Sequence, residues 1–128
     1  MTAYKPPGHN AVSPYLLVTS VTRHVAFLQA AFGAIRLDAM TLPDGTVKHA
    51  EVRIDDSIIM LGERPDGRDP MPCSNHVYVP DVDATYRTAL DAGAASVTPP
   101  TDQPYGDRSA GVRDAEGHVW WLGTRITG

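Results

Sequence analysis

Among the five histidines and fifteen acidic residues of this 128-residue chain, His49, Glu51 and His76 are the candidates for a shared metal site. Imidazole nitrogen and carboxylate oxygen are ligands that zinc and related ions prefer. His49 and Glu51 alternate along one expected strand, so they share a face of it. Two interpretations stay open. Either His76 combines with Glu51 or His49 in a metal site, or His76 lines a pocket and the other two are ordinary polar residues of a strand.

The remaining candidates for catalysis have simpler explanations. Asp55 and Asp56 are adjacent carboxylates, but neighbouring residues in a tight turn point apart, so a solvated hairpin tip is the better interpretation. His118 follows a turn without a serine or cysteine in a triad-like relation. His24 is expected on the solvent-facing side of a helix. Cys73 is a lone cysteine in a proline-flanked loop, which predicts a free thiol in a reducing compartment.

One expected loop of the second half carries an arginine that could bind a ligand. The run Gly106-Asp107-Arg108 lacks the strand–turn–helix setting of a phosphate-binding loop. We therefore expect it at the mouth of a pocket, where Arg108 or Arg113 contacts an anionic or planar ligand. For Arg113, a structural role beside Asp114 is an equally good interpretation.

Composition and charge narrow the class of protein. Fifteen acidic and eleven basic residues give a net charge of −4, whereas a nucleic-acid surface needs clustered lysine and arginine. No apolar stretch approaches the roughly 18 residues of a membrane span, and the N-terminus lacks the apolar core of a signal peptide. We expect a cytoplasmic single domain, 1–128, that binds neither nucleic acid nor membrane, with residues 1–10 as a loose lead-in.

The chain repeats one pattern after about sixty residues. Gly33, after an expected helix, is matched by Gly93, and Leu61 by Leu122, so the offset grows by only one residue. A nearly constant period with matching helix ends indicates a duplicated supersecondary unit. The chain should therefore contain two similar modules.

Hydrophobic spacing assigns the elements of the first half. Val21, Val25, Leu28 and Phe32 recur at helical intervals, and Gly33 is the expected end of that helix. Runs of β-branched and aromatic residues predict strands, with turn residues between them. The expected elements are a strand over about 13–19, a helix over about 22–32, and strands over about 34–41, 47–54 and 57–63.

The second half follows the same order. Val82, Tyr86 and Leu90 form the buried stripe of a helix that an aspartate at 81 or 83 caps and Gly93 ends. We expect a proline-rich loop over 99–104. The expected strands are about 75–79 before the helix, and about 94–98, 109–114 and 118–124 after it.

The order strand, helix and three strands, found twice, resembles the vicinal oxygen chelate superfamily of glyoxalases, bleomycin-resistance proteins and ring-cleaving dioxygenases. The resemblance implies an α+β fold in which two βαβββ modules form a cup from two half-barrels. Module 1 covers about 11–63, a linker about 64–72 and module 2 about 73–126. The motifs are most similar to the PhnB-like branch: Tyr105-Gly106-Asp107-Arg108, the turn Asp114-Ala115-Glu116-Gly117-His118 and Trp120-Trp121, with Phe32-Gly33-Ala34 and Val79–Asp83.

Metal-using members of this superfamily hold a divalent ion at the centre of the cup with His, Gln or Glu side chains, two from each module. By resemblance, the corresponding positions here are Ser13, Met60, Ser74 and Trp121. Hydroxyl, thioether and indole groups make a poor ligand set for such an ion. We therefore expect no metal and no cofactor at this centre.

The aromatic residues of the last strand favour a binding role. Trp120 and Trp121 are consecutive, so one faces the helices and the other the cup, and the resemblance assigns Trp121 to the cup. With Met60, Tyr15 and His76 on inward positions, Trp121 would form an apolar floor with a few polar tips, typical of small-molecule sites. The alternative is that Trp121 merely fills the cup as core.

The first functional hypothesis is a metal-free protein that binds a small molecule, sequestering an aromatic or drug-like ligand as bleomycin-resistance proteins do in antibiotic resistance. The second is a metal-dependent lyase, isomerase or dioxygenase of the glyoxalase kind with displaced ligands. A third is a domain whose partner is itself or another protein. We expect a homodimer, because relatives close the cup by packing or exchanging halves and two-fold pairs are the commonest oligomers. The expected ligand-binding residues are Ser13, Tyr15, Met60, Ser74, His76, Arg108 and Trp121.

Overall fold

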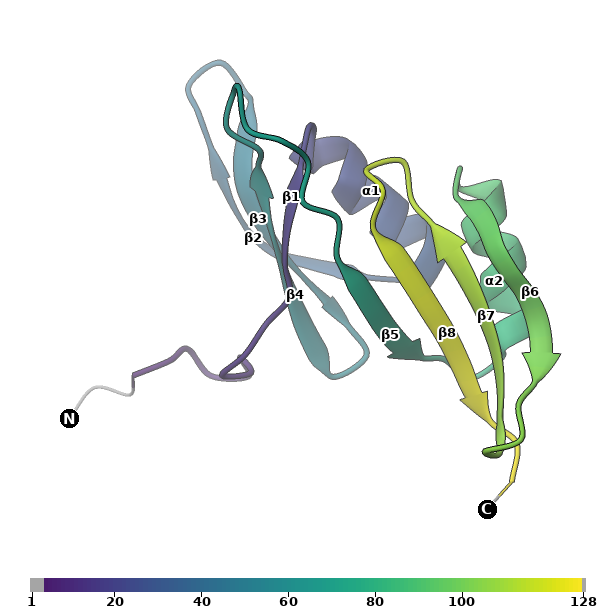
Figure 1. Ribbon diagram of the computed structural model, residues 1–128. Coiled ribbons are helices and arrows are strands. Elements are labelled where there is room, and N and C mark those ends of the chain that lie inside the picture. The colour runs from purple at the N-terminus through teal and green to yellow at the C-terminus, as the bar shows by residue number, and fades with distance from the viewer. Residues whose placement is uncertain (1–3, 128) are drawn as a thin grey trace.

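The computed structural model describes residues 4–127 and confirms the duplicated α+β fold (Figure 1). The expected lead-in over 1–10 lies partly outside this range, as do residues 1–3 and 128 of the expected domain. Module 1 contains β1 (Tyr15–Val18), α1 (Val21–Phe32), β2 (Ile35–Thr41), β3 (Val47–Ile54) and β4 (Ser57–Glu63). Module 2 contains β5 (Ser74–Tyr78), α2 (Val82–Asp91), β6 (Ala95–Asp102), β7 (Asp107–Arg113) and β8 (Val119–Arg125).

Each module forms one mixed four-stranded sheet, in the order β1-β4-β3-β2 for sheet A and β5-β8-β7-β6 for sheet B. The first strand of each pairs parallel with the last, and the other pairs are antiparallel. Tyr15 pairs with Met60 in sheet A as His76 pairs with Trp121 in sheet B. The offset is 61 residues for both members of the pair (76 − 15 and 121 − 60). The internal symmetry therefore holds residue by residue in the strands.

Both helices begin and end where local chemistry favours it. The Oγ of Ser20 accepts the N–H of Arg23, and Oδ1 of Asp81 accepts that of Ala84, each at 3.2 Å. These side chains satisfy N–H groups that have no partner within the helix. Gly33 ends α1 in the left-handed region, with φ of 66°, which glycine adopts without steric cost. The expected end of α1 at Gly33 is confirmed.

The helices share one core with both sheets. Val21, Val25 and Leu28 of α1 are buried, as the helical spacing predicts. The rings of Phe32 and Trp120 lie 5.1 Å apart between centroids, so α1 of module 1 also packs against sheet B. This cross-module contact joins the two modules into one hydrophobic cluster.

The predicted proline-rich loop over 99–104 was wrong in part, because β6 continues to Asp102 through Pro99 and Pro100. β6 is an edge strand, where a proline costs little because its missing N–H would face solvent. The pairing with β7 slips between Thr98 and Thr101, so both prolines lie within this irregularity. The prolines thus correctly indicated an irregularity in the strand, but the strand ends later than they predicted.

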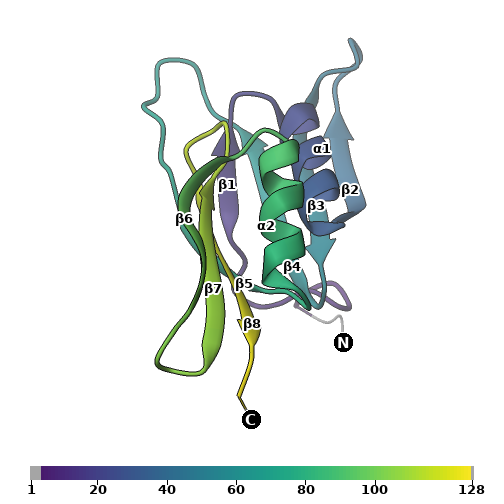
Figure 2. The same ribbon diagram turned by 90° about the vertical axis from the view of Figure 1, so that its right-hand side faces the viewer.

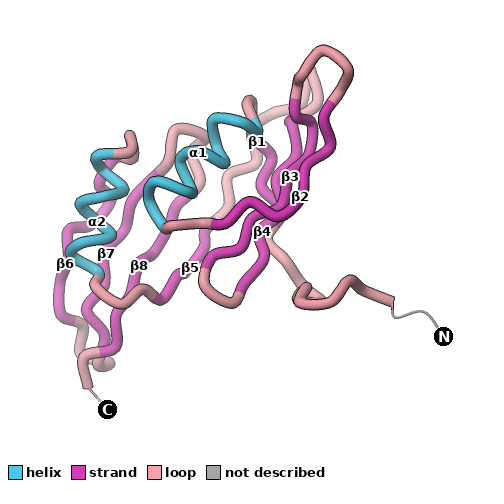
Figure 3. The backbone as a smooth tube through the Cα atoms, turned by 180° about the vertical axis from the view of Figure 1, so that it is seen from behind, coloured by secondary structure: helices cyan, strands magenta, loops and turns pink. Residues whose placement is uncertain are grey.

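The helices leave one face of each sheet uncovered, called here the open face. α1 and α2 pack against each other and lie together when the molecule is seen from behind (Figure 3). The open faces of sheets A and B lie side by side and do not face one another (Figures 1 and 2). One chain therefore does not close a cup between the two sheets. No helix of the described range is long and apolar enough to cross a membrane.

Candidate functional site

The open face of sheet B carries a flat aromatic platform built on Trp121. The Trp121 side chain is 38% exposed, and its ring lies over Gly111 of the neighbouring strand, where an added Cβ would come within 2.6 Å of the indole. On the other side, indole Nε1–H donates to Oγ of Ser74 at 2.9 Å. The indole thus spans β5 to β7 in a fixed orientation. The face that it presents to solvent suits stacking against a planar molecule.

His76 and Tyr78 extend this platform along β5. The His76 ring lies over Gly123, where an added Cβ would approach it to 3.0 Å. The rings of His76 and Tyr78 meet edge to face, with centroids 4.6 Å apart. The Tyr78 hydroxyl donates to Oδ2 of Asp107 at 2.9 Å, and this hydrogen bond raises the pKa of Tyr78. The Asp107 carboxylate also pairs with Arg125 at 3.4 Å, so the edge of the platform is polar and its charges are paired.

The open face of sheet A repeats one feature of this platform. Tyr15 lies over Gly62, where an added Cβ would come within 2.5 Å of its hydroxyl oxygen. Tyr15 and Gly62 are the symmetry mates of His76 and Gly123, both at an offset of 61 residues (76 − 15 and 123 − 62). Met60 lies in register between Tyr15 of β1 and Glu51 of β3. Its symmetry mate is Trp121, so sheet A has a thioether where sheet B has the indole.

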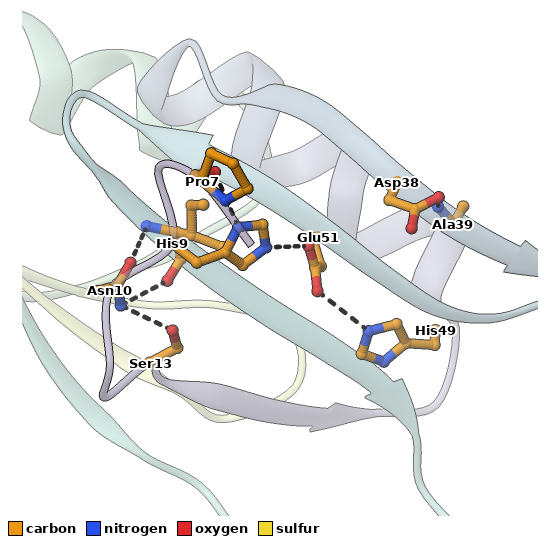
Figure 4. Close-up of polar contacts among 9 residues, drawn as sticks. Pro7, His9, Asn10, Ser13, Asp38, Ala39, His49 and Glu51 are labelled. Atoms are coloured by element: carbon orange, nitrogen blue, oxygen red, sulfur yellow. Dashed lines mark hydrogen bonds and ion pairs between the residues drawn. The ribbon is translucent and has the colours of Figure 1, made fainter. Parts of the chain in front are cut away.

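A polar array around Glu51 lies on the open face of sheet A (Figure 4). Nε2–H of His9 donates to Oε1 of Glu51 at 2.7 Å, and His49 Nε2 lies 3.8 Å from Oε2 of the same carboxylate. The Tyr15 hydroxyl forms a hydrogen bond with Nδ1 of His49 at 3.3 Å. The hydrogen bond to Glu51 raises the pKa of His9, which outweighs the opposing effect of desolvation.

His9 and Asn10 belong to the N-terminal segment, which we expected to be a loose lead-in. In the described part of that segment, these two residues are instead bonded to sheet A. Asn10 accepts the N–H of Ile58 at 3.0 Å and donates to the Oγ of Ser13 at 2.7 Å. Ser13 therefore holds this segment in place. No periodic or motif signal in the sequence marks a histidine of a proline-rich segment as a partner of a distant strand.

Arg108 lies away from both open faces, so its expected place in a loop at the mouth of the pocket was wrong. It is the second residue of β7, and its guanidinium points to the helix side, donating to both Asp83 carboxylate oxygens at 2.9 and 3.1 Å. A third bond, at 2.9 Å, reaches Asp102. These partners raise the pKa of Arg108 further above its usual value. β7 begins at Asp107, so Arg108 is a strand residue and not a loop residue. Because side chains alternate between the two faces of a strand, Arg108 points to the helix side.

The interface between the modules contains a buried polar cluster around Asp114, and it corrects the expectation that His24 faces solvent. His24 is 4% exposed, and its Nε2 lies 3.2 Å from Oδ2 of Asp114, at ion-pair distance but off the hydrogen-bond axis. Trp120 Nε1–H donates to the same oxygen at 2.9 Å. Burial would raise the pKa of Asp114, but the contacts with His24 and Trp120 outweigh it and lower the pKa. α1 has a second buried face because it lies between two sheets.

His118 extends this cluster across the two modules. Its Nδ1 accepts the N–H of Cys73 at 2.9 Å, and its Nε2–H donates to the carbonyl of Leu17 in β1 at 3.2 Å. Both ring nitrogens are thus used in structural hydrogen bonds. Burial raises the pKa of the Cys73 thiol, and the Asp114 charge adds to this. Raised pKa values disfavour a thiolate nucleophile.

Two clefts formed by residues 4–127 lie away from both open faces. One lies between α1 and sheet A, lined by residues such as Val21, Gln29, Arg36 and Ala50. The other lies between the modules, lined by residues such as Thr19, His24, Phe27 and Glu116. Trp121, Met60 and Tyr15 line neither cleft, and the 38% exposure of Trp121 places the platform on the surface of a single chain.

The family of the chain follows from its sequence and fold together. Residues 8–122 match the model of the glyoxalase/bleomycin resistance protein/dioxygenase superfamily. The chain belongs to this superfamily. An uncharacterized protein of Mycobacterium tuberculosis is 37% identical over 127 residues, which cover 91% of this chain and 75% of that protein. A counterpart in Mycobacterium bovis shows the same identity, with 84% of its length covered.

Solved structures of the superfamily share the fold. TioX from Micromonospora sp. ML1 is 29% identical, with a TM-score of 0.74 over 93% of this chain and 98% of that one. The fosfomycin resistance protein FosX from Listeria monocytogenes is 19% identical, with a TM-score of 0.70 over 90% of this chain and 92% of that one. The second likeness concerns the fold alone.

The residues at the superfamily's metal positions do not fit a divalent ion. Oγ of Ser13 accepts from Asn10 and Oγ of Ser74 accepts from Trp121, while Met60 offers a thioether. Within one chain the displaced set does not assemble either, because His76 packs on Tyr78 of sheet B whereas His49 and Glu51 lie on sheet A. Within residues 4–127, no group of three or more His, Cys, Asp or Glu side chains is placed to hold an ion.

Proposed function

We propose that this protein binds a flat aromatic small molecule, without a metal, on the Trp121 platform. The observation that carries the proposal is the indole of Trp121, fixed by Ser74 and Gly111 with one face left to solvent. A rigid aromatic surface binds by stacking at low entropic cost. A protein that only sequesters its ligand needs no catalytic group beside this surface.

Within the superfamily, we place the chain in the PhnB-like branch. The support is the motif from Tyr105-Gly106-Asp107-Arg108 to Trp120-Trp121, which supplies both the platform and the buried tryptophan beneath it.

We further propose that two chains complete the cup. The open faces expose apolar side chains that one chain leaves uncovered, such as Tyr15 at 49%, Met40 at 55% and Trp121 at 38%. Apolar surface of this kind often marks an interface. Pairing sheet A of one chain with sheet B of its partner would bring Met60 opposite a Trp121 and enclose the ligand site between the two faces. This is the half-exchanged arrangement of a homodimer.

Light scattering at micromolar concentration tests the dimer, because a monomer has a mass of 13.8 kDa. We expect twice that mass, and Met40→Glu on the edge strand should return the chain to monomer. A 13.8 kDa particle in the unmodified protein would refute the dimer.

Tryptophan fluorescence tests the ligand. A library of aromatic natural products is titrated into the unmodified protein and into Trp121→Ala, and we expect quenching that only the unmodified protein shows. Metal analysis of protein purified without chelators is the second arm. Stoichiometric nickel, zinc, manganese or iron, with a reaction lost on chelation, would overturn the proposal in favour of a metal-dependent enzyme.

A further inference from the structure

The N-terminal segment is docked on the open face of sheet A. The side chain of Asn10 bonds to both backbone groups of Ile58, accepting at 3.0 Å and donating at 3.4 Å. Ile58 shares a strand face with Met60 and Gly62 and is only 2% exposed, yet it lies outside the hydrophobic core cluster. We attribute its burial to the segment that lies on it.

Glu51 is the carboxylate that this segment reaches. The side chains of His9 and Glu51 are each 16% exposed, and their 2.7 Å contact is the shortest ion pair in the described residues. In that part of the chain, no lysine or arginine pairs with Glu51, and its only basic neighbours are His9 and His49. Asp38, the register partner of Glu51 on β2, places a second carboxylate on the adjacent strand. This patch therefore favours a cationic partner.

In module 2, the position that corresponds to Glu51 is occupied by a glycine, Gly111. Glu51 pairs with Met60 as Gly111 pairs with Trp121, and in sheet B the indole covers Gly111. The segment before β5 does not reach that face, because Cys73 bonds to the buried His118. In sheet A, by contrast, the imidazole of His9 takes the place beside Glu51, and it comes from a segment outside the module.

We propose that, across the proposed dimer, Glu51 on sheet A recognises a cationic nitrogen of the ligand that stacks on the facing Trp121 of the partner subunit, and that His9 is an internal substitute which the ligand displaces. The inference rests on the proposed function, and it specifies the ligand class as planar aromatic cations, such as protonated heterocycles or aromatic amidines. An imidazole ring on a carboxylate has the shape and the N–H donor that such a ligand would offer. The segment is held mainly by side chains of Asn10 and His9, so displacement breaks few contacts.

Two acridine probes of opposite charge test the proposal by fluorescence anisotropy: proflavine, a planar cation, and acridine-9-carboxylate, a planar anion. For Glu51→Gln we expect about tenfold weaker proflavine binding and no loss of acridine-9-carboxylate binding, since a charge-assisted bond is lost. For His9→Ala we expect about tenfold tighter proflavine binding, because the internal competitor is gone. A purely structural role of His9 would weaken binding of both probes.

The controls separate charge from folding. Asp91→Asn removes one exposed carboxylate at the end of α2, far from the open faces, and should leave proflavine binding unchanged. His9→Gln keeps an N–H donor and should behave like the unmodified protein. Equal changes for both probes, or no gain with His9→Ala, would overturn the inference while leaving the proposed function intact. Failure of both probes to respond to Trp121→Ala would instead contradict the proposed function.

Discussion

The two open faces have nearly the same backbone, but their side chains differ in chemistry. Sheet B presents rings that lie flat over Gly111 and Gly123, whereas sheet A presents the Glu51 carboxylate under a histidine from the N-terminal segment. One register position decides the difference. A glycine leaves room for the neighbouring indole, while a glutamate fills that room and attracts a basic side chain. The duplicated modules have the same strand arrangement. A few different side chains make the open face of sheet B a stacking surface and that of sheet A a charged surface.

The helix-facing sides of the same sheets show the opposite behaviour. Val52 and Val112 are matched and both fully buried, as are Leu61 and Leu122. Close packing tolerates little change of volume, which is consistent with the same residue in both modules at these two pairs of positions. This contrast suggests that the open faces serve function and the helix-facing sides serve stability. Trp120 and Trp121, adjacent residues of β8, test it.

Trp120 and Trp121 should separate stability from binding more than any other pair of positions. Trp120 is 1% exposed, so Trp120→Ala should lower the free energy of unfolding by about 3–5 kcal/mol. Trp121→Ala should lower it by only about 1 kcal/mol, since its indole is partly exposed, but it should cost on the order of 2 kcal/mol of ligand-binding energy. Denaturant unfolding and fluorescence titration measure the two effects. A larger loss of stability in Trp121→Ala would reverse the assignment of faces.

Asp114 should make the helix-facing side sensitive to acid. Its pKa is lowered in the folded protein, so its stabilising effect is present above the unfolded pKa and is lost as pH falls through the folded value. Asp114→Asn keeps one acceptor but removes the charge beside His24, which should cost about 1–3 kcal/mol at neutral pH. Unfolding midpoints should therefore differ between the two proteins at pH 7 and converge in acid. A constant difference down to strongly acidic pH would show that the charge of Asp114 is not the cause.

The glycines beneath the rings test the comparison of the open faces directly. Gly111→Ala places a methyl group within 2.6 Å of the Trp121 indole and should lift it from the sheet. We expect about 1–2 kcal/mol weaker binding of a planar ligand, in the range of other overpacking effects. Gly62→Ala displaces Tyr15 in the same way and should affect binding less, because sheet A lacks the platform. Equal effects of both substitutions would remove the distinction between the two sheets.

The duplication and the helices followed from spacing, because period and turn chemistry are local properties of the sequence. Spacing also placed Trp120 and Trp121 on opposite faces, but only the family resemblance assigned Trp121 to the open one. His24 was misplaced because helical periodicity shows one buried face, whereas α1 lies between two sheets and has a second. His9 was missed because its contact with Glu51 spans 42 residues and no local pattern announces it. The open face of sheet A thus depends on tertiary contacts that spacing does not encode.

Arg108 should give the smallest effect and thereby limit the site to the open faces. Its guanidinium is engaged by Asp83 and Asp102, but these side chains are 34%, 44% and 66% exposed, respectively. Exposed ion pairs contribute about 0–1 kcal/mol because water and salt screen them. Arg108→Ala should therefore lower stability by less than about 1 kcal/mol and leave the binding of planar ligands unchanged. If a titration instead showed a loss of binding as large as that of Trp121→Ala, the ligand would have to contact the edge of sheet B beside α2, and the open faces could not be the whole site.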